Sequence, residues 1–309
     1  MDKEISEQFS KQRADLSVLS IKTYTNCLTK VLEIMKAKDV KILYDNPDIV
    51  IETMKNFYKN ANTLKTKFGS ILAFLSLLKS NKEVIQAQTK YLTETDNLNQ
   101  IIKDKLKDNL KDDKQRRNMI TKEEQKQVEE HLKSELIDNP RSFDDYIKLR
   151  NYVIFKLYMA IPSRLDFADA KILYSTDNHE SDEYNYIILN KKHKTSIYIM
   201  NAYKTFKSYG QKIINIDKEL YDLLNDYKKI IDKFHRESYF LLNHHGRQMT
   251  RNNLSIIYKS FGNVIDKPIT VSGNRHDAVS NIIPIEDMKE LSNKMAHSID
   301  EAIKVYVKL

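Results

Sequence analysis

Residues 271–309 read VSGNRHDAVSNIIPIEDMKELSNKMAHSIDEAIKVYVKL. This stretch contains an Arg-His pair at Arg275 and His276, a second histidine at His297 and a tyrosine at Tyr306. His297 follows Arg275 within the same stretch, and Tyr306 stands nine positions after His297. A guanidinium, an imidazole and a phenol are groups that a phosphoryl-transfer site uses, so we searched the rest of the chain for a second arginine and a lysine.

The composition indicates a mostly helical protein of two domains. The chain has 309 residues, which is long for one domain, and 41% of them are hydrophobic, which is enough for packed cores. Glycine and proline occur only five times each, so turn-forming residues are scarce. The single cysteine, Cys27, excludes an intramolecular disulfide and a cysteine-based metal site.

Positive charge is concentrated in the first part of the chain. The net charge is +8, and residues 1–120 hold 22 Lys and Arg against 16 Asp and Glu, whereas residues 121–309 hold 29 against 27. A basic region beside a near-neutral one is typical of a protein that binds a polyanion. Lysine-rich usage from an AT-rich coding sequence explains the same charge equally well.

The sequence lacks the features of a membrane-spanning, secreted, nucleotide-binding or metal-binding protein. The chain lacks an apolar run long enough to span a membrane, and its first residues, MDKEISEQFSKQ, lack a signal-peptide core, so we expect an intracellular protein of the cytoplasm or nucleus that is not secreted. No phosphate-binding glycine motif occurs, and we expect no cofactor and no metal. The pair His244-His245 has no further ligand at metal spacing and is interpreted as a turn.

Residues 1–112 are predicted to form a helical core-DNA-binding domain. Apolar residues recur at helical spacing in 17–35, 47–59, 60–79 and 82–108, after a polar start at 1–16 that we expect to be frayed. The third helix has a basic side, with Lys65, Lys67 and Lys79, that suits a phosphate backbone. An ordinary solvated face is the alternative for any one of these lysines.

A linker at 113–120 is predicted to lead into a catalytic domain at 121–309, where Thr121 and Glu124 form a capping box. Helices are expected at 122–137, 143–160, 218–234, 250–264, 272–283, 285–295 and 299–307. Strands are expected at Tyr184–Leu189, Thr195–Met200 and Lys212–Ile216, with a further short one at Tyr239–Leu242. The predicted fold class is therefore mainly α with a small antiparallel β-sheet.

Cutting and rejoining a DNA strand without ATP or metal requires few groups. A nucleophile has to keep the bond energy in a covalent ester, and Tyr306 suits this. Arginines have to hold the non-bridging oxygens, for which Arg164 and Arg275 are the candidates. The leaving 5′ oxygen needs a proton, for which Lys204 is the candidate, and His297 would hydrogen-bond the phosphate or assist proton transfer.

The order of four segments resembles the tyrosine recombinase (phage-integrase) family. These segments are IPSRLDFADAKI (161–172), NAYKTFKSYG (201–210), GNRHDAVS (273–280) and MAHSIDEAIKVYVK (295–308). The resemblance covers most of residues 121–309, and the first and second segments are most similar to integrases of large DNA viruses and their satellites. It implies a recombinase-like catalytic domain with Arg164, Lys204, Arg275, His297 and Tyr306 as its catalytic set.

The chain departs from the family pattern at positions 272 and 167, and two lysines are candidates for the general acid. Ser272 stands three residues before Arg275, where the family has His or Lys, and His276 is either a substitute or a structural residue. Phe167 stands where the family often has an acid, which leaves Asp166 and Asp169 as alternatives for supporting Arg164. Lys207 competes with Lys204 for the role of general acid.

The resemblance implies a site-specific DNA recombinase or integrase with a covalent 3′-phosphotyrosyl intermediate. Its expected partners are double-stranded DNA and further copies of the chain, as a tetramer on paired sites. Two alternatives stay open. One is a type IB topoisomerase or telomere resolvase, which uses similar chemistry, and the other is a catalytically impaired DNA-binding protein of the same fold, which Ser272 favours.

Overall fold

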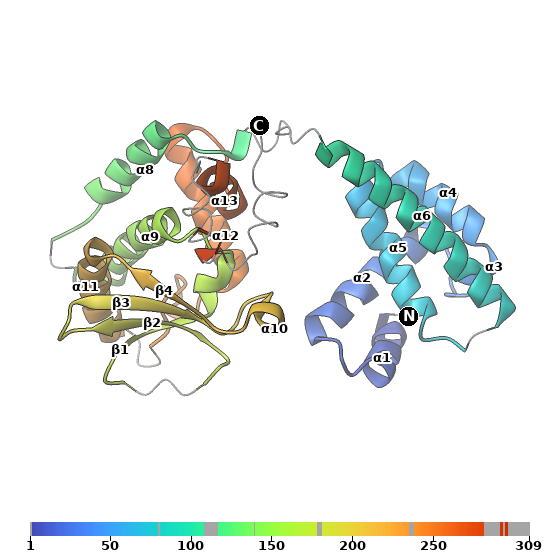
Figure 1. Cartoon of the computed structure of the whole chain (residues 1–309), viewed down its shortest axis with the longest axis horizontal. Coiled ribbons are helices and arrows are strands. Elements are labelled where there is room, and N and C mark those ends of the chain that lie inside the picture. Colours follow the sequence, from blue (N-terminus) through green and yellow to red (C-terminus); the bar gives the residue numbers. More distant parts are fainter. Residues whose placement is uncertain are drawn as a thin grey trace. The chain divides into compact units, whose positions relative to one another are not determined.

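The computed structural model (Figure 1) describes residues 2–79, 81–107, 117–138, 140–177, 181–234, 238–280, 291–292 and 294–295, with side chains except at 105–107 and 279–280. The chain divides into two units, Met1–Asp108 and Asn109–Leu309. The helices among the described residues are too short or too polar to span a lipid bilayer.

The described part of the first unit is all helical. Its helices are α1 (Asp2–Gln12), α2 (Val18–Ile34), α3 (Ile42–Asp45), α4 (Pro47–Phe57), α5 (Ala61–Leu75) and α6 (Lys82–Lys107). Local signals set the helix starts: the Ser17 side chain accepts from the Ser20 amide, that of Asn60 accepts from the Thr63 amide, and Pro47 occupies the first turn of α4.

Two expectations for this unit are wrong. Residues 1–16 are not frayed, because α1 buries Ile5 and Phe9, and Phe9 stacks on Tyr24 with ring centroids 5.4 Å apart. Helix α5 ends at Leu75, so Lys79 lies beyond the helix on which it was expected. A short apolar pair in a polar segment escapes a periodicity argument, although two residues four apart are enough to bury one helix face.

Replacement of Phe9 by alanine tests whether α1 belongs to the core. Phe9 is fully buried, so Phe9→Ala should destabilise the first unit by about 3–5 kcal/mol through lost burial and a cavity. Phe57, which is 58% exposed, is the matched control, and Phe57→Ala should cost less than about 1 kcal/mol. Amide hydrogen exchange across α1, α2 and α5 measures the difference. Equal exchange in both variants would contradict a packed α1.

The second unit combines helices with one small sheet. Its described elements are α8 (Lys122–Ser134), α9 (Phe143–Ala160), η1 (Leu165–Asp169), β1 (Ala170–Tyr174), β2 (Asn185–Asn190), β3 (Thr195–Met200), α10 (Phe206–Tyr209), β4 (Lys212–Ile216), α11 (Lys218–Phe234), α12 (Arg251–Ser260), η2 (Phe261–Ile265) and α13 (Val271–Ser280). The fold class, mainly helical with a small sheet, is confirmed.

The sheet is mixed rather than antiparallel. Its order is β1-β2-β3-β4, and the three strands expected from the sequence pair antiparallel as β2, β3 and β4. Strand β1, which the pattern did not indicate, pairs parallel with β2, from Ala170 beside Asn185 to Tyr174 beside Leu189. Tyr239–Leu242 does not form the expected strand, and it makes only isolated bridges, Lys171 to Tyr239 and Leu242 to Gln248.

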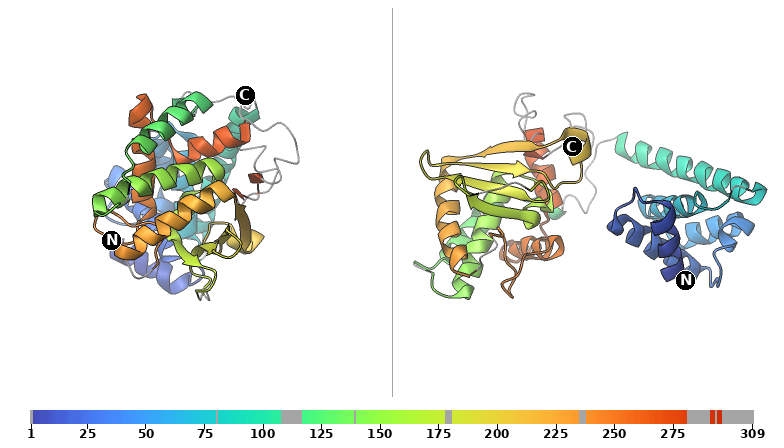
Figure 2. Two further views of the ribbon diagram at one scale, coloured as in Figure 1. Left: turned by 90° about the vertical axis from the view of Figure 1, so that its left-hand side faces the viewer. Right: turned by 90° about the horizontal axis from the view of Figure 1, so that it is seen from below.

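One face of the sheet packs on helices. Ile172, Ile187 and Tyr198 face a core shared with α9, α11 and α12, and α9 and α11 lie on the same side of the sheet (Figure 2). Leu173, Tyr186 and Ile188 form a smaller cluster on the opposite face. The alternation along each strand therefore separates two apolar layers.

Capping chemistry fixes the first helices of this unit. Thr121 and Glu124 form the expected capping box, and Ser142 and Asp145 form another at the start of α9. Helices α9 and α11 have their expected bounds, whereas the helix expected at 250–264 is α12 followed by η2. The helix expected at 272–283 is α13, and those expected at 285–295 and 299–307 fall largely or wholly outside the described residues.

Glu124 should make the stability of this unit depend on pH. Partial burial acts to raise the pKa of Glu124, but hydrogen bonds from Lys267 and the Thr121 amide outweigh it and lower the pKa. A lowered carboxyl pKa stabilises the fold above the unfolded value, near 4.3, and this contribution disappears as pH falls through the folded value. Glu124→Gln should therefore lower the free energy of unfolding by about 1 kcal/mol at pH 7 and leave it unchanged at pH 2. Urea unfolding at both pH values measures this, and an equal loss at both would contradict it.

Candidate functional site

Arg164 lies where α9 gives way to η1. Pro162 cannot continue the helix, and the chain turns through Ser163 into η1, whose N-cap is Arg164. The carbonyl of Arg164 accepts hydrogen bonds from the Tyr158 hydroxyl at 2.9 Å and the Ser163 hydroxyl at 3.0 Å. The backbone beneath the arginine is therefore fixed to the last turns of α9.

Asp166 is a buried acid with positive charge near it. It is only 1% exposed, and burial raises its pKa, while the positive charges of Arg251, Arg164 and Arg275 oppose that rise. Arg251 contacts it, with Nη2 3.4 Å from Oδ1. Burial and the charge of Asp166 raise the pKa of Tyr158, and Arg275 and Arg251 oppose that rise. Arg164 and Arg275, which come from widely separated segments of the sequence, thus both contribute charge at Asp166. Of the two acids left open by the sequence, Asp166 is the one near all three arginines.

Arg275 lies on α13 and is buried. Arg275 is 4% exposed, and its Nη2 donates to the carbonyl of Met295 at 3.4 Å. The neighbouring Asn274 donates from Nδ2 to the Tyr158 carbonyl at 2.7 Å, so α13 is tied to α9 beside Arg275. Met295 is two residues before His297 in the sequence.

The last residues of the predicted linker also pack on α13. The Ile120 amide donates to Oδ2 of Asp277 at 2.7 Å. A Cβ on Gly273 would lie 2.3 Å from the carbonyl oxygen of Asn118, so only glycine allows this close approach. The chain that enters the second unit is therefore in direct contact with the helix that carries Arg275.

Lys204 lies on the turn between β3 and β4, at the end of the sheet where β1 and β2 begin. Its side chain is exposed, as is that of Lys207 in α10. Burial and the charge of Asp166 raise the pKa of Tyr203, the residue before Lys204, and the charge of Arg164 opposes that rise. The turn that carries Lys204 is bonded to η1 through Asn185, which contacts both Ala202 and Asp166.

A buried asparagine joins this turn to η1. Asn185 is fully buried at the start of β2, and its Oδ1 accepts from the amides of Asn201 and Ala202 at 2.9 and 2.8 Å. Its Nδ2 donates to the carbonyls of Asp166 at 2.9 Å and Ala202 at 3.3 Å. One side chain therefore fixes the Arg164 segment relative to the Lys204 turn.

Arg251, at the start of α12, was not a candidate from the sequence. Its Nε donates to Oδ2 of Asp169 at 2.6 Å, and its Nη2 lies 3.4 Å from Oδ1 of Asp166 and donates to the Ala202 carbonyl at 3.4 Å. These partners all lie far upstream of Arg251 in the sequence, so a local motif could not predict the contacts. In the structure, the Thr250 side chain caps the start of α12 by accepting from the Asn253 amide.

The other predicted site residues are Ser272, His276, His297 and Tyr306. Ser272 is exposed on the first turn of α13, and His276 is half-buried. His297 and Tyr306 lie outside the described residues. The structure brings together Arg164, Arg275 and the Lys204 turn, and it does not test the other two.

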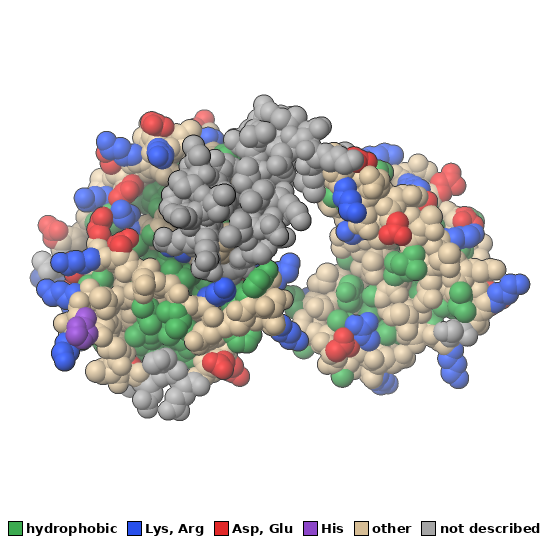
Figure 3. All heavy atoms as spheres, in the orientation of Figure 1, with side chains coloured by type: hydrophobic (Ala, Val, Ile, Leu, Met, Phe, Trp, Pro, Cys, Tyr) green, Lys and Arg blue, Asp and Glu red, His purple; other side chains and the backbone are tan. Residues whose placement is uncertain are grey.

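The three lysines of the first unit differ in their surroundings. Lys65 and Lys79 are exposed, whereas Lys67 is half-buried, donates to Sγ of Cys27 at 3.5 Å and lies over the ring of Tyr58. On the face shown in Figure 3, basic side chains of each unit are interspersed with acidic ones. Of these three lysines, only Lys65 is an exposed residue of α5, because Lys67 is half-buried and Lys79 lies beyond the helix.

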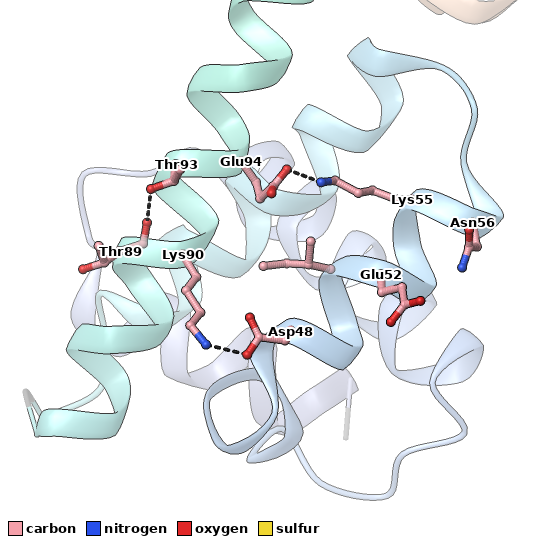
Figure 4. Close-up of a pocket in the computed structure, with 9 residues that line it drawn as sticks. Asp48, Glu52, Lys55, Asn56, Thr89, Lys90, Thr93 and Glu94 are labelled. Atoms are coloured by element: carbon pink, nitrogen blue, oxygen red, sulfur yellow. Dashed lines mark hydrogen bonds and ion pairs between the residues drawn. The ribbon is translucent and has the colours of Figure 1, made fainter.

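A hollow of about 440 Å³ lies between α4 and α6, and four of the charged groups that line it form two ion pairs. Figure 4 shows Lys90 directed at Asp48 and Lys55 directed at Glu94, each with its ion pair drawn. These pairs join the two helices across the hollow. Among the described residues, no group of three His, Cys, Asp or Glu side chains is arranged to hold a metal ion.

The cluster in the second unit is suited to binding an anion. Arg164, Arg251 and Arg275 carry three positive charges against the two of Asp166 and Asp169, so the cluster holds an excess of positive charge. Fixed guanidinium groups bind phosphate oxygens in a defined geometry.

No protein-family model and no curated protein matches the sequence. Among solved structures, a crystal structure of XerA recombinase superposes with a TM-score of 0.45 and 13% sequence identity, over all of this chain and 93% of that one.

Replacement of Asn185 tests whether the turn and η1 form one unit. Asn185→Ala removes four hydrogen bonds to backbone groups, of which the Ala202 carbonyl keeps Arg251 as a donor, and should cost about 3 kcal/mol or more. Asn190, at the other end of β2, accepts one bond from the His193 amide and is the matched control, with an expected cost of about 1 kcal/mol. Urea unfolding measures both, with hydrogen exchange of residues 201–211. Equal costs would contradict the role of Asn185.

Proposed function

We propose that this chain is a site-specific DNA recombinase or integrase that cuts and rejoins DNA through a covalent bond to Tyr306. The observation that carries the proposal is that hydrogen bonds tie three distant segments together. Tyr158 joins the Arg164 segment to α13, which carries Arg275, and Asn185 joins the Arg164 segment to the turn that bears Lys204. Two arginines and a lysine from distant segments are what a phosphoryl-transfer site requires.

In the proposed reaction, the two arginines hold the non-bridging oxygens of the scissile phosphate. The Tyr306 oxygen forms a bond to phosphorus, its proton passes to His297, and the bond from phosphorus to the 5′ oxygen breaks. Lys204 gives a proton to that oxygen, which leaves as a 5′ hydroxyl. Rejoining reverses these steps, with another 5′ hydroxyl as the attacking group, so the ester bond energy is retained without ATP.

Asp166 has a supporting role in this proposal. Three guanidinium groups near each other repel, and a buried carboxylate between them offsets that repulsion before DNA arrives. Because the three arginines outnumber Asp166 and Asp169, one positive charge remains for the phosphate. The carboxylate therefore preorganises the site without neutralising it.

The two parts of the chain have separate roles in the proposal. Residues 1–112 bind the duplex, with Lys65 and Lys79 as exposed phosphate contacts, while Lys67 is already bonded within the unit. Residues 121–309 carry the chemistry, and 113–120 connect them. Strand exchange needs two cut duplexes, so we expect a homotetramer on paired sites.

A non-catalytic DNA-binding protein of the same fold is the second candidate. The observation that favours it is Ser272, a weak proton carrier that stands exposed on α13 where the family has His or Lys. A type IB topoisomerase or telomere resolvase would share the chemistry and differ in product, namely relaxed plasmid or a closed hairpin end instead of exchange between two sites.

Covalent capture tests the proposal. The target sequence is first selected from random-sequence duplexes that carry a nick, so that the cut strand diffuses away and the adduct persists. The intact chain should form a protein–DNA adduct, and Tyr306→Phe should form none while it binds DNA with unchanged affinity.

Tyr209, an exposed tyrosine at the end of α10, is the matched control, and Tyr209→Phe should retain the adduct. An adduct in the Tyr306→Phe variant would show that another group is the nucleophile. Tight binding with no adduct from the intact chain would favour the non-catalytic candidate.

A further inference from the structure

Arg251 connects three segments of the second unit. It is the first residue of α12, and its guanidinium contacts Asp169 at 2.6 Å, Asp166 at 3.4 Å and the Ala202 carbonyl at 3.4 Å. The two acids lie in η1, shortly after Arg164. Ala202 lies on the turn between β3 and β4, two residues before Lys204. One planar group thus bridges the segments that carry Arg164 and Lys204.

These contacts differ from an ordinary surface ion pair. The side chain of Arg251 is 47% exposed, but one of its partners, Asp166, is 1% exposed and cannot exchange this contact for water. Burial acts to lower the pKa of Arg251, and the hydrogen bond and charge of Asp169 outweigh it, so the net shift is upward. The guanidinium is held as a cation by the groups that it bridges.

Arg251 and Asn185 join the same two segments from different sides. Asn185 is fully buried and uses only neutral hydrogen bonds to backbone groups. Arg251 adds charged contacts near the surface, where Lys204 is exposed. We therefore expect replacement of Arg251 to make the Lys204 turn more mobile at its exposed side, while the Asn185 hydrogen bonds still join the turn to η1.

We propose that Arg251 is a positioning residue that sets the place of Lys204 relative to the phosphate held by Arg164 and Arg275. This inference rests on the proposed function, in which Lys204 protonates the leaving 5′ oxygen. A displacement of the turn by a fraction of an ångström to one ångström would weaken that proton transfer without removing the phosphate clamp. Lysine at 251 keeps the charge but lacks the planar fork that bridges three acceptors.

The test compares two leaving groups on the selected nicked duplex. One substrate has the natural 5′ bridging oxygen, and the other has sulfur in its place. A thiolate leaves without protonation because a thiol has a pKa near 8.5, so cleavage of the sulfur substrate does not need a general acid. Single-turnover rates of adduct formation are measured for both substrates.

Arg251→Gln and Arg251→Lys should slow cleavage of the oxygen substrate about tenfold or more and leave the sulfur substrate within about threefold of the intact chain. Lys204→Ala should give the same pattern with a larger loss. Arg164→Ala should be slow on both substrates, because its role is to hold the phosphate. Asp169→Asn, which removes the shortest Arg251 contact and keeps the arginine, should give the Arg251 pattern in weaker form.

Arg247, an exposed arginine four residues earlier, is the matched control, and Arg247→Gln should change neither rate. Equal losses on both substrates in Arg251→Lys and Asp169→Asn would overturn the inference and show that Arg251 holds the phosphate or the fold. Unchanged rates would also overturn it. If the intact chain cleaves neither substrate, the proposed function itself fails, whereas an active chain without the selective effect contradicts only the role of Arg251.

Discussion

The second unit depends on a buried carboxylate that has to be compensated. Asp166 is almost fully buried, and an isolated carboxylate in that position would be costly. Burial raises its pKa, the positive charges of Arg251, Arg164 and Arg275 oppose that rise, and Arg251 of α12 forms an ion pair with it at 3.4 Å. The same three arginines would repel one another without it. The carboxylate and the arginines therefore stabilise each other, and their excess positive charge is available to a ligand.

Backbone contacts give this charge cluster its geometry. Asn185 fixes the turn after β3 to η1, and Asn274 fixes α13 to α9. The last residues of the predicted linker pack on α13 through Ile120 and through the close approach at Gly273. The chain that enters this part of the second unit is therefore in direct contact with the helix that carries Arg275.

The sequence predicted local features well and long-range ones poorly. Helix α9 and the Thr121 cap follow from apolar spacing and capping chemistry, and the structure confirms both. Strand β1 was missed because AKILY is short and its partner, β2, begins only after the intervening segment 175–184. Arg251 was missed because its acidic partners lie in η1, far upstream in the sequence, and only folding brings them together. Arg164 and Arg275 could be named through a family resemblance, and Asp166 and Asp169 as alternative supports for Arg164, but the sequence did not decide between the two acids.

The central claim is that Tyr306 attacks a phosphate held by Arg164 and Arg275, and identification of the residue bonded to DNA tests it most directly. The covalent complex would be digested with protease and nuclease, and the peptide that retains a nucleotide would be sequenced by mass spectrometry. The account predicts a single modified peptide with the 3′ phosphate on Tyr306, formed much more slowly when Arg164 or Arg275 is replaced by alanine. A nucleotide on any other residue, or an adduct that forms at the intact rate in either alanine variant, would contradict it.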